Sequence, residues 1–190
     1  MGVTGILGGA FDPPHEGHVA LAKAAKERFG LDRLLVLVAV APGHKGVEAP
    51  AEDRLALAQA AFPDEDVRLD DHARTVDLLR DERFDDPLFL IGADEFCDFL
   101  AWKDPDGVLE LTRLGVATRP GYPEGRIRNV LDRLDHPERV EFFEIEPHPV
   151  ASRDLRERLR RGQTLDGLVP ARVAELIRER GLYRRGSGLH

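Results

Sequence analysis

Short apolar segments alternate with amphipathic ones along almost the whole chain of 190 residues. Leu34–Val40 and Leu88–Ile91 are continuous apolar runs, which is the pattern of strands buried on both faces. Between them, His18–Phe29 repeats its apolar residues with helical spacing and is followed by Gly30, a residue favoured just after a helix. Strands that alternate with helices predict a parallel sheet with helices on both faces.

We therefore predict an α/β fold, organised as a Rossmann-like doubly wound parallel sheet with helices on both faces and a small C-terminal helical segment. We expect one domain over residues 1–185 and a flexible tail over residues 186–190. The other strands are expected near residues 3–7, 67–69, 114–118 and 140–145. Further helices are expected near residues 53–62, 75–83, 127–134, 152–161 and 171–180, together with one that ends at residues 108–111.

Charge and cysteine usage limit the classes of function. The net charge of −8 argues against general nucleic-acid binding, which needs a basic surface. The single cysteine, Cys97, excludes an intramolecular disulfide and indicates a reducing compartment. We see no basic and apolar leader and no apolar span long enough for a membrane helix, so we expect a cytoplasmic protein that contacts no membrane.

Four expected strand ends carry residues suited to ligand binding. In open parallel sheets, ligands bind beyond the carboxyl ends of the strands. We therefore expect these four segments to meet at one edge of the sheet. They are Gly8-Gly9 with His15 and His18, Pro42-Gly43-His44-Lys45, Gly92-Ala93-Asp94 and Thr118-Arg119-Pro120.

The segment GGAFDPPHEGH, residues 8–18, places two histidines where a helix begins. A helix N-terminus offers unpaired N–H groups and partial positive charge, which attract phosphate. Gly8 and Gly9 let the backbone approach a ligand closely, and His15 and His18 add side-chain donors for the same anion. The segment therefore indicates phosphate binding, and the alternative is a pair of histidines that only pack.

Other ligand motifs fit this segment poorly. It has neither the three-glycine dinucleotide pattern nor the Gly-Lys-Ser/Thr ending of a phosphate-binding loop. A zinc site needs three or four ligands, and no cysteine or further histidine has the spacing to complete one. We expect Asp12 to be a turn residue, and we expect no metal site in the chain.

The same segment resembles the His-x-Gly-His signature of the nucleotidyltransferase superfamily, and its Gly-Gly-x-Phe-Asp-Pro opening resembles the nicotinate-nucleotide adenylyltransferase family. Four further segments resemble that family in the same order along the chain. They are PGHK at 42–45 with EDRL at 52–55, GAD at 92–94 with Trp102-Lys103, VASRDLR at 150–156, and IRERGLY at 177–183. The resemblance covers nearly the whole chain, so residues 1–185 are identified as one nucleotidyltransferase domain.

The resemblance implies adenylyl transfer from ATP to nicotinate mononucleotide, which yields nicotinate adenine dinucleotide and pyrophosphate in NAD biosynthesis. His15, His18, Lys45 and Arg156 would be the catalytic residues, and magnesium would arrive with ATP. ATP would also contact Gly8, Gly9, Phe11, Ser152 (a candidate N-cap) and Asp94, whose carboxylate suits a ribose. The acceptor would contact Trp102, a ring suited to stacking on pyridine, with Thr75, Arg74 and Arg119.

Two departures from the family pattern leave alternatives open. The family's Ser-Tyr-Thr reads Ala73-Arg74-Thr75 here, so nicotinamide mononucleotide or another phosphate acceptor, such as phosphopantetheine, remains an alternative substrate. The family's Ser-Ser-Thr reads Ala151-Ser152-Arg153, and either phosphate contact or solvation fits Arg153. A nucleotide-binding module without turnover is the alternative from another class, although the intact histidines argue against it. Self-assembly into a homo-oligomer is also left open.

Overall fold

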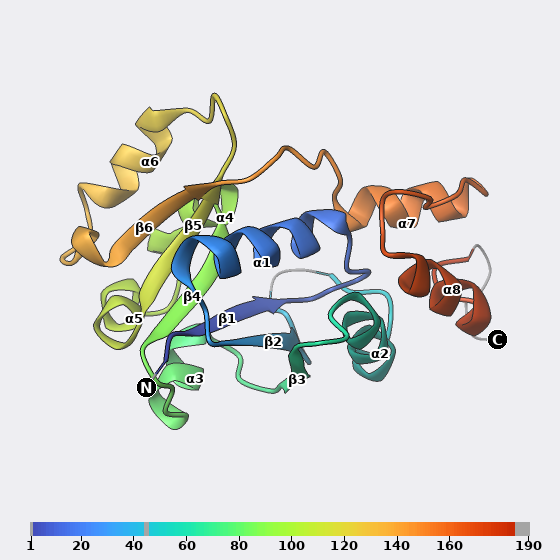
Figure 1. Cartoon of the computed structure of the whole chain (residues 1–190), viewed down its shortest axis with the longest axis horizontal. Coiled ribbons are helices and arrows are strands. Elements are labelled where there is room, and N and C mark those ends of the chain that lie inside the picture. Colours follow the sequence, from blue (N-terminus) through green and yellow to red (C-terminus); the bar gives the residue numbers. More distant parts are fainter. Residues whose placement is uncertain (1, 44–45, 185–190) are drawn as a thin grey trace. The chain divides into compact units, whose positions relative to one another are not determined.

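The computed structural model describes residues 2–43 and 46–184 (Figure 1). Its six strands are β1 (Thr4–Gly9), β2 (Arg33–Ala39), β3 (Asp66–Asp70), β4 (Pro87–Gly92), β5 (Arg113–Thr118) and β6 (Val140–Glu144). Its helices are α1 (Glu16–Phe29), α2 (Ala51–Ala61), α3 (Thr75–Asp81), α4 (Ala93–Cys97), α5 (Pro105–Leu111), α6 (Glu124–Leu131), α7 (Ser152–Arg160) and α8 (Ala171–Arg180), with short 3-10 turns η1 (Phe99–Ala101) and η2 (Pro137–Arg139).

The strands are hydrogen bonded in the order β3-β2-β1-β4-β5-β6, which is the order of a doubly wound sheet. β1 pairs with β4, β4 with β5 and β5 with β6, and all three pairs are parallel (Figure 1). In the last two pairs Gly92 lies opposite Ala117 and Thr118 lies opposite Glu144, so these three strands end at one edge. The predicted Rossmann-like α/β fold is confirmed.

The chain forms two compact units, each assembled from segments that are distant in sequence. The first unit contains Met1–Gly8, Ala20–Leu35 and His72–Pro147, and the second contains Gly9–Val19, Val36–Asp71 and His148–His190. The prediction of a single domain over residues 1–185 stays a prediction, and the expected tail over residues 186–190 lies outside the described residues.

The first unit has its core on strands β4 and β5, whose central residues are almost completely buried. Phe29 of α1 meets Phe143 of β6 edge to face at 5.3 Å, and Phe96 of α4 meets Phe142 in the same way at 5.7 Å. Successive residues of a strand point to opposite faces, so β6 contributes one ring to each side of the sheet.

The second unit packs α2 against α8, and both helices bury apolar side chains there. Leu57 and Ala58 of α2 and Val173 of α8 have no exposed surface. In the part of the chain that the structure describes, no helix combines the length and apolar character needed to cross a membrane.

Most predicted elements are confirmed within a few residues, and the errors concern helix starts. α1 begins at Glu16, whereas the apolar periodicity placed its start at His18. α6 occupies Glu124–Leu131, whereas residues 127–134 were predicted. The five-residue helix α4, which follows β4 directly, was not predicted because five residues are too few to show the helical periodicity of apolar side chains.

Candidate active site

The histidine segment connects β1 to α1 and closes the first turn of the helix. The carbonyl of His15 accepts from the backbone N–H groups of His18 at 3.0 Å and Val19 at 3.3 Å, so His15 occupies the N-cap position. Its ring Nδ1 accepts from the N–H of Gly17 at 3.1 Å, and its own N–H donates to Nδ1 of His18, also at 3.1 Å. Two histidines thereby form a reciprocal cap, the arrangement that Ser and Glu form in a capping box.

These hydrogen bonds fix the tautomer of both rings. A ring nitrogen that accepts from a backbone N–H carries no proton, so Nε2–H is the donor of each neutral imidazole. The rings stack with their centroids 3.8 Å apart, a spacing that disfavours two positive charges. Burial, and secondarily the charge of His148, lowers the pKa of His15 to about 4. His15 is therefore neutral at pH 7.

Phe11 packs its side chain against the histidine segment. It is buried and holds a left-handed backbone conformation with φ of 50°. Its ring lies 5.0 Å from that of His18 and meets Phe62 edge to face at 6.0 Å. A Cβ atom on Gly9 would lie 3.2 Å from the Phe11 ring, tighter than ordinary contact, so glycine suits this position.

Asp12 ties the histidine segment to the rest of the second unit. Its buried carboxylate accepts from the N–H groups of Glu48 at 2.7 Å and Ala49 at 3.1 Å, and from the Tyr183 hydroxyl at 2.7 Å. Burial and the bond to Asp12 raise the pKa of Tyr183, so its hydroxyl keeps its proton and donates. Asp12 is therefore a buried acceptor that joins three segments, a larger role than the turn residue that we predicted.

Arg54 is the largest fully buried side chain of the described residues. Its guanidinium donates to four backbone carbonyls, those of Ala49, Ala10, Ala39 and Val40, at 2.7 to 3.0 Å. Ala10 directly follows β1, Ala39 and Val40 lie at the end of β2, and Ala49 lies just before α2, so one side chain satisfies carbonyls from three segments. Arg54 thus fixes the loops that carry the histidines, a role that its place in the helix sequence did not reveal.

Helix α7 begins beside the histidine segment. The hydroxyl of Ser152 donates to the carbonyl of Pro13 at 2.8 Å, and Ala151 occupies the N-cap position without a side-chain bond. The prediction that Ser152 caps the helix is wrong, because its hydroxyl is engaged with the loop. Arg156 donates to the carbonyl of Asp12 at 2.9 Å and pairs with Glu48, so two predicted site residues, Ser152 and Arg156, contact the loop before α1.

In the first unit, Asp94 follows the end of β4, as expected, and lies in the first turn of α4. Its Oδ1 accepts from the Tyr122 hydroxyl at 2.8 Å and lies 3.6 Å from the Arg126 guanidinium. The guanidinium groups of Arg119 and Arg126 lie 5.6 and 5.9 Å from the centre of the Tyr122 ring. Arg119 itself is exposed.

Trp102 is half-buried, at the end of η1. Its ring meets Phe99 at 5.2 Å and Phe89 at 6.1 Å, both edge to face, which holds its plane in one orientation. The next residue, Lys103, donates to Asp77 of α3 at 2.8 Å. Thr75 is the first residue of α3, and Arg74 precedes it as an exposed side chain bonded to the Ala73 carbonyl.

A family model described as cytidylyltransferase-like matches residues 6–158. Proteins named "probable nicotinate-nucleotide adenylyltransferase" from Rubrobacter xylanophilus and Thermus thermophilus are both 36% identical to this chain. The alignments cover 95% of this chain in both cases, and 92% and 98% of those proteins. The chain belongs to the nicotinate-nucleotide adenylyltransferase family.

A solved structure shares the fold. The nicotinic acid mononucleotide adenylyltransferase of Plasmodium falciparum, complexed with NaAD, superposes with a TM-score of 0.77 at 15% identity. The match covers 96% of this chain and 98% of that one. The resemblance that the sequence motifs suggested is therefore confirmed at the level of family and fold.

Of the residues that the family pattern assigned to ATP, His15, His18, Gly9, Phe11, Ser152 and Arg156 belong to the second unit, whereas Gly8, Asp94 and the residues assigned to the acceptor belong to the first. Lys45 lies outside the described residues. Sequence reasoning gave no role to Arg54, Glu48 or Tyr183. Arg54 offered a signal, because it is a single arginine on a helix whose other buried residues are Leu57, Ala58 and Ala61.

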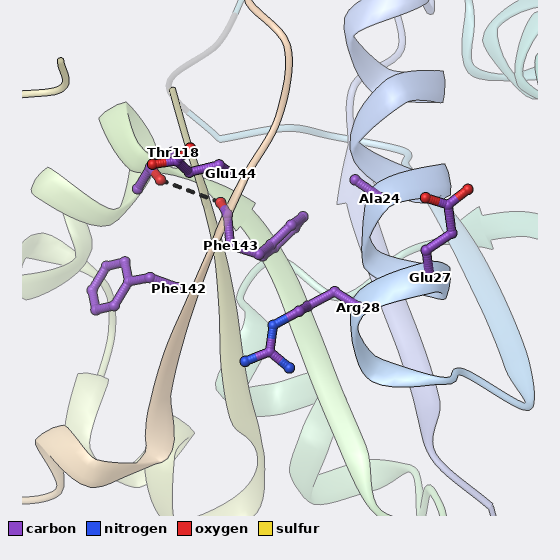
Figure 2. A pocket seen from close by; sticks show the side chains of 7 residues that line it. All are labelled: Ala24, Glu27, Arg28, Thr118, Phe142, Phe143 and Glu144. Atoms are coloured by element: carbon purple, nitrogen blue, oxygen red, sulfur yellow. Dashed lines mark hydrogen bonds between the residues drawn. The ribbon is translucent and has the colours of Figure 1, made fainter. Parts of the chain in front are cut away.

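A cavity of about 660 Å³ lies in the first unit, and of the four segments predicted to bind ligand only Thr118 lines it (Figure 2). Ala24, Glu27 and Arg28 of α1 line one side, and Phe142, Phe143 and Glu144 of β6 line the other together with Thr118. The Thr118 hydroxyl donates to the Phe143 carbonyl at 3.3 Å. The lining contains acidic and basic side chains, and the family pattern assigns a role to none of these residues.

Proposed function

We propose that this member of the nicotinate-nucleotide adenylyltransferase family transfers the adenylyl group of ATP to nicotinate mononucleotide. A phosphate oxygen of the mononucleotide attacks the α-phosphorus of ATP, and the bond from that phosphorus to the bridging oxygen breaks. Nicotinate adenine dinucleotide forms and pyrophosphate leaves. The observation that carries the proposal is the stacked pair of imidazoles at the start of α1, in which each Nδ1 accepts from a backbone N–H and each Nε2 is left as the phosphate donor.

The attacking oxygen is already ionised at pH 7, so the reaction needs no general base. Phosphoryl-type transfer depends mainly on positioning and on stabilising the charge that develops on the phosphates. His18 would donate to the α-phosphate, His15 with the backbone of Gly8, Gly9 and Phe11 would hold neighbouring oxygens, and Lys45 would add charge. Ser152 and Arg156 would bind the β- and γ-phosphates.

Asp94 would accept from a hydroxyl of the ATP ribose. On the acceptor side, the indole of Trp102 would stack on the pyridine ring. Thr75, Arg74 and Arg119 would complete the binding of the mononucleotide. Magnesium belongs to the substrate, since ATP carries it mainly through its phosphates and water. The cytoplasmic location stays a prediction, as does the absence of nucleic-acid and membrane partners.

The test is pyrophosphate release from Mg-ATP with nicotinate mononucleotide, nicotinamide mononucleotide or phosphopantetheine as acceptor. The proposal expects rapid release with nicotinate mononucleotide and a dinucleotide product of the corresponding mass. Pyrophosphate release only with another acceptor would mean that the substrate is assigned wrongly and the reaction class correctly. ATP binding without release under any condition would make the chain a nucleotide-binding module.

A further inference from the structure

Glu48 joins two arginines of α7. Nε of Arg156 donates to its Oε1 at 2.9 Å, and Arg160 donates to both carboxylate oxygens. Arg156 and Arg160 are four residues apart in the helix, so their side chains share one face. This arginine pair, Arg156 and Arg160, therefore holds an anionic group between two guanidiniums.

The arginine pair has the features of a polyphosphate site. Arg156 is fixed by its bond to the Asp12 carbonyl and by the Asp12 carboxylate at 3.7 Å, and its side chain is 13% exposed. Arg160 is more accessible, at 33%, and has Glu157 at 3.5 Å as its second partner. Two guanidiniums present several donors to one anion, which suits phosphate as well as carboxylate.

Glu48 is held in place from its backbone. Its N–H donates to the Asp12 carboxylate at 2.7 Å, and its side chain is 37% exposed. Partial burial raises the pKa of Glu48, but the bonds and charges of Arg160 and Arg156 outweigh it and lower the pKa below its usual range. The carboxylate stays ionised at neutral pH and competes with any other anion for the two guanidiniums.

We propose that Arg160 extends the phosphate site of Arg156, and that the Glu48 carboxylate occupies this arginine pair until the β- and γ-phosphates of ATP displace it. The inference rests on the proposed function, because it takes ATP as the ligand. Breaking the Glu48 pairs opposes binding, so the free energy of these pairs is subtracted from the affinity for ATP.

The first test measures binding of Mg-ATP and of AMP by calorimetry to the parent and to Glu48→Gln. The variant is expected to bind Mg-ATP about three- to tenfold tighter, the range of one or two released surface ion pairs. AMP lacks the β- and γ-phosphates, so its affinity should not change. The matched control is Glu175→Gln, which removes a carboxylate paired with Arg172 on α8 and should alter neither affinity.

The second test compares Arg160→Gln with Arg161→Gln, a neighbour on α7 that pairs with Glu157. Arg160→Gln should weaken Mg-ATP about three- to tenfold and leave AMP unchanged, and Arg161→Gln should change neither. In the double variant Glu48→Gln/Arg160→Gln, the gain from Glu48→Gln should shrink, because one partner of the carboxylate is gone.

The inference is overturned if Glu48→Gln leaves the affinity for Mg-ATP unchanged or lowers it. It is also overturned if the variant raises the affinity for AMP by the same factor, which would indicate a general effect of charge. Thermal unfolding of each variant identifies misfolding, and if Glu48→Gln fails to fold, the comparison of Arg160→Gln with Arg161→Gln decides alone. A parent that binds no Mg-ATP overturns the proposed function as well. If the parent catalyses the reaction and every variant binds Mg-ATP with the affinity of the parent, only the role of Glu48 and Arg160 is overturned.

Discussion

The rings of His15 and His18 stack 3.8 Å apart, and the N–H of His15 donates to Nδ1 of His18. The same two residues therefore shape the start of α1 and present its donors. A substitution at either position affects two properties, the cap of the helix and the Nε2–H donor, and the variants must separate them.

His18→Ala should lower kcat far more than it raises the KM for ATP. A donor that acts mainly in the transition state is worth on the order of 3 kcal/mol, or about a hundredfold in kcat. His18→Asn tests the cause, since its amide oxygen can replace Nδ1 in the cap while its amide N–H groups lie nearer the backbone than the Nε2–H of histidine. We expect Asn to match Ala in kcat and the parent in thermal stability. Turnover within a factor of about three of the parent would exclude this role.

The stability of the protein should depend on His15 in mildly acidic solution. His15 takes up a proton near pH 6.5 in the unfolded chain but only near pH 4 in the folded protein. The unfolded state binds more protons between these values, so the free energy of unfolding falls as the pH drops through this window. His15→Asn keeps a capping acceptor and removes the titration, so urea denaturation at pH 7 and pH 5 should show a smaller loss than in the parent.

The control for this pH dependence is His136→Asn, at an exposed site of the first unit. It should follow the parent at both pH values. If the free energy of unfolding falls equally in the parent and in His15→Asn between pH 7 and pH 5, groups other than His15 cause the acid sensitivity.

Asp12→Asn should destabilise the protein by about 3 kcal/mol, because an amide hydrogen would face donors in a buried site beside Arg156. Tyr183→Phe removes one of the hydrogen bonds to Asp12 and should cost about 1 kcal/mol. Denaturant unfolding measures both, with Asp166→Asn, an exposed substitution in the same unit, as the control. A loss of stability for Asp12→Asn as small as that for Asp166→Asn would contradict the role of Asp12 as a buried acceptor that joins three segments.

Trp102→Ala should raise the KM for nicotinate mononucleotide about tenfold and leave the KM for ATP nearly unchanged, since a stacked ring contributes roughly 1 kcal/mol or more. Trp102→Phe keeps an aromatic ring against Phe99 and should recover most of the loss. Steady-state kinetics with each substrate varied in turn gives both values. Equal changes for ATP and the mononucleotide would mean that Trp102 supports the fold and not the acceptor.

Arg74→Ala decides how the acceptor is selected. If the guanidinium pairs with the carboxylate of nicotinate, the variant should lose much of the preference for nicotinate over nicotinamide mononucleotide. The measurement is kcat/KM for both acceptors, with Arg83→Ala, another exposed arginine, as the control. A preference that survives the loss of Arg74 would place selection elsewhere in the site, and a parent that prefers the amide would change the substrate.

The sheet and its order of elements were predictable from local pattern. Leu34–Val40 and Leu88–Ile91 are continuous apolar runs, and such runs have a stable place only between two layers of helices. The histidine pair could also be placed from sequence, because a glycine-rich strand end followed by a helix start is a local signal.

The start of α1 and the cap of α7 were not predictable in this way, since both depend on partners far along the chain. The N–H of Glu16 donates to the Leu168 carbonyl, and Ser152 donates to Pro13 instead of capping its own helix. Apolar periodicity shows which face of a helix is buried but contains no information on such bonds.

The sequence by itself determined the fold class, the family motifs and the residue types available for phosphate. Only the tertiary structure decided how those residues are held: Asp12 became a buried acceptor for Tyr183, more than 170 residues away, and Glu48 became the partner of Arg156 and Arg160. The physical reason is that a buried or competing charge is defined by the groups around it. Those groups come from segments whose proximity is set by the packed chain and not by their order in sequence.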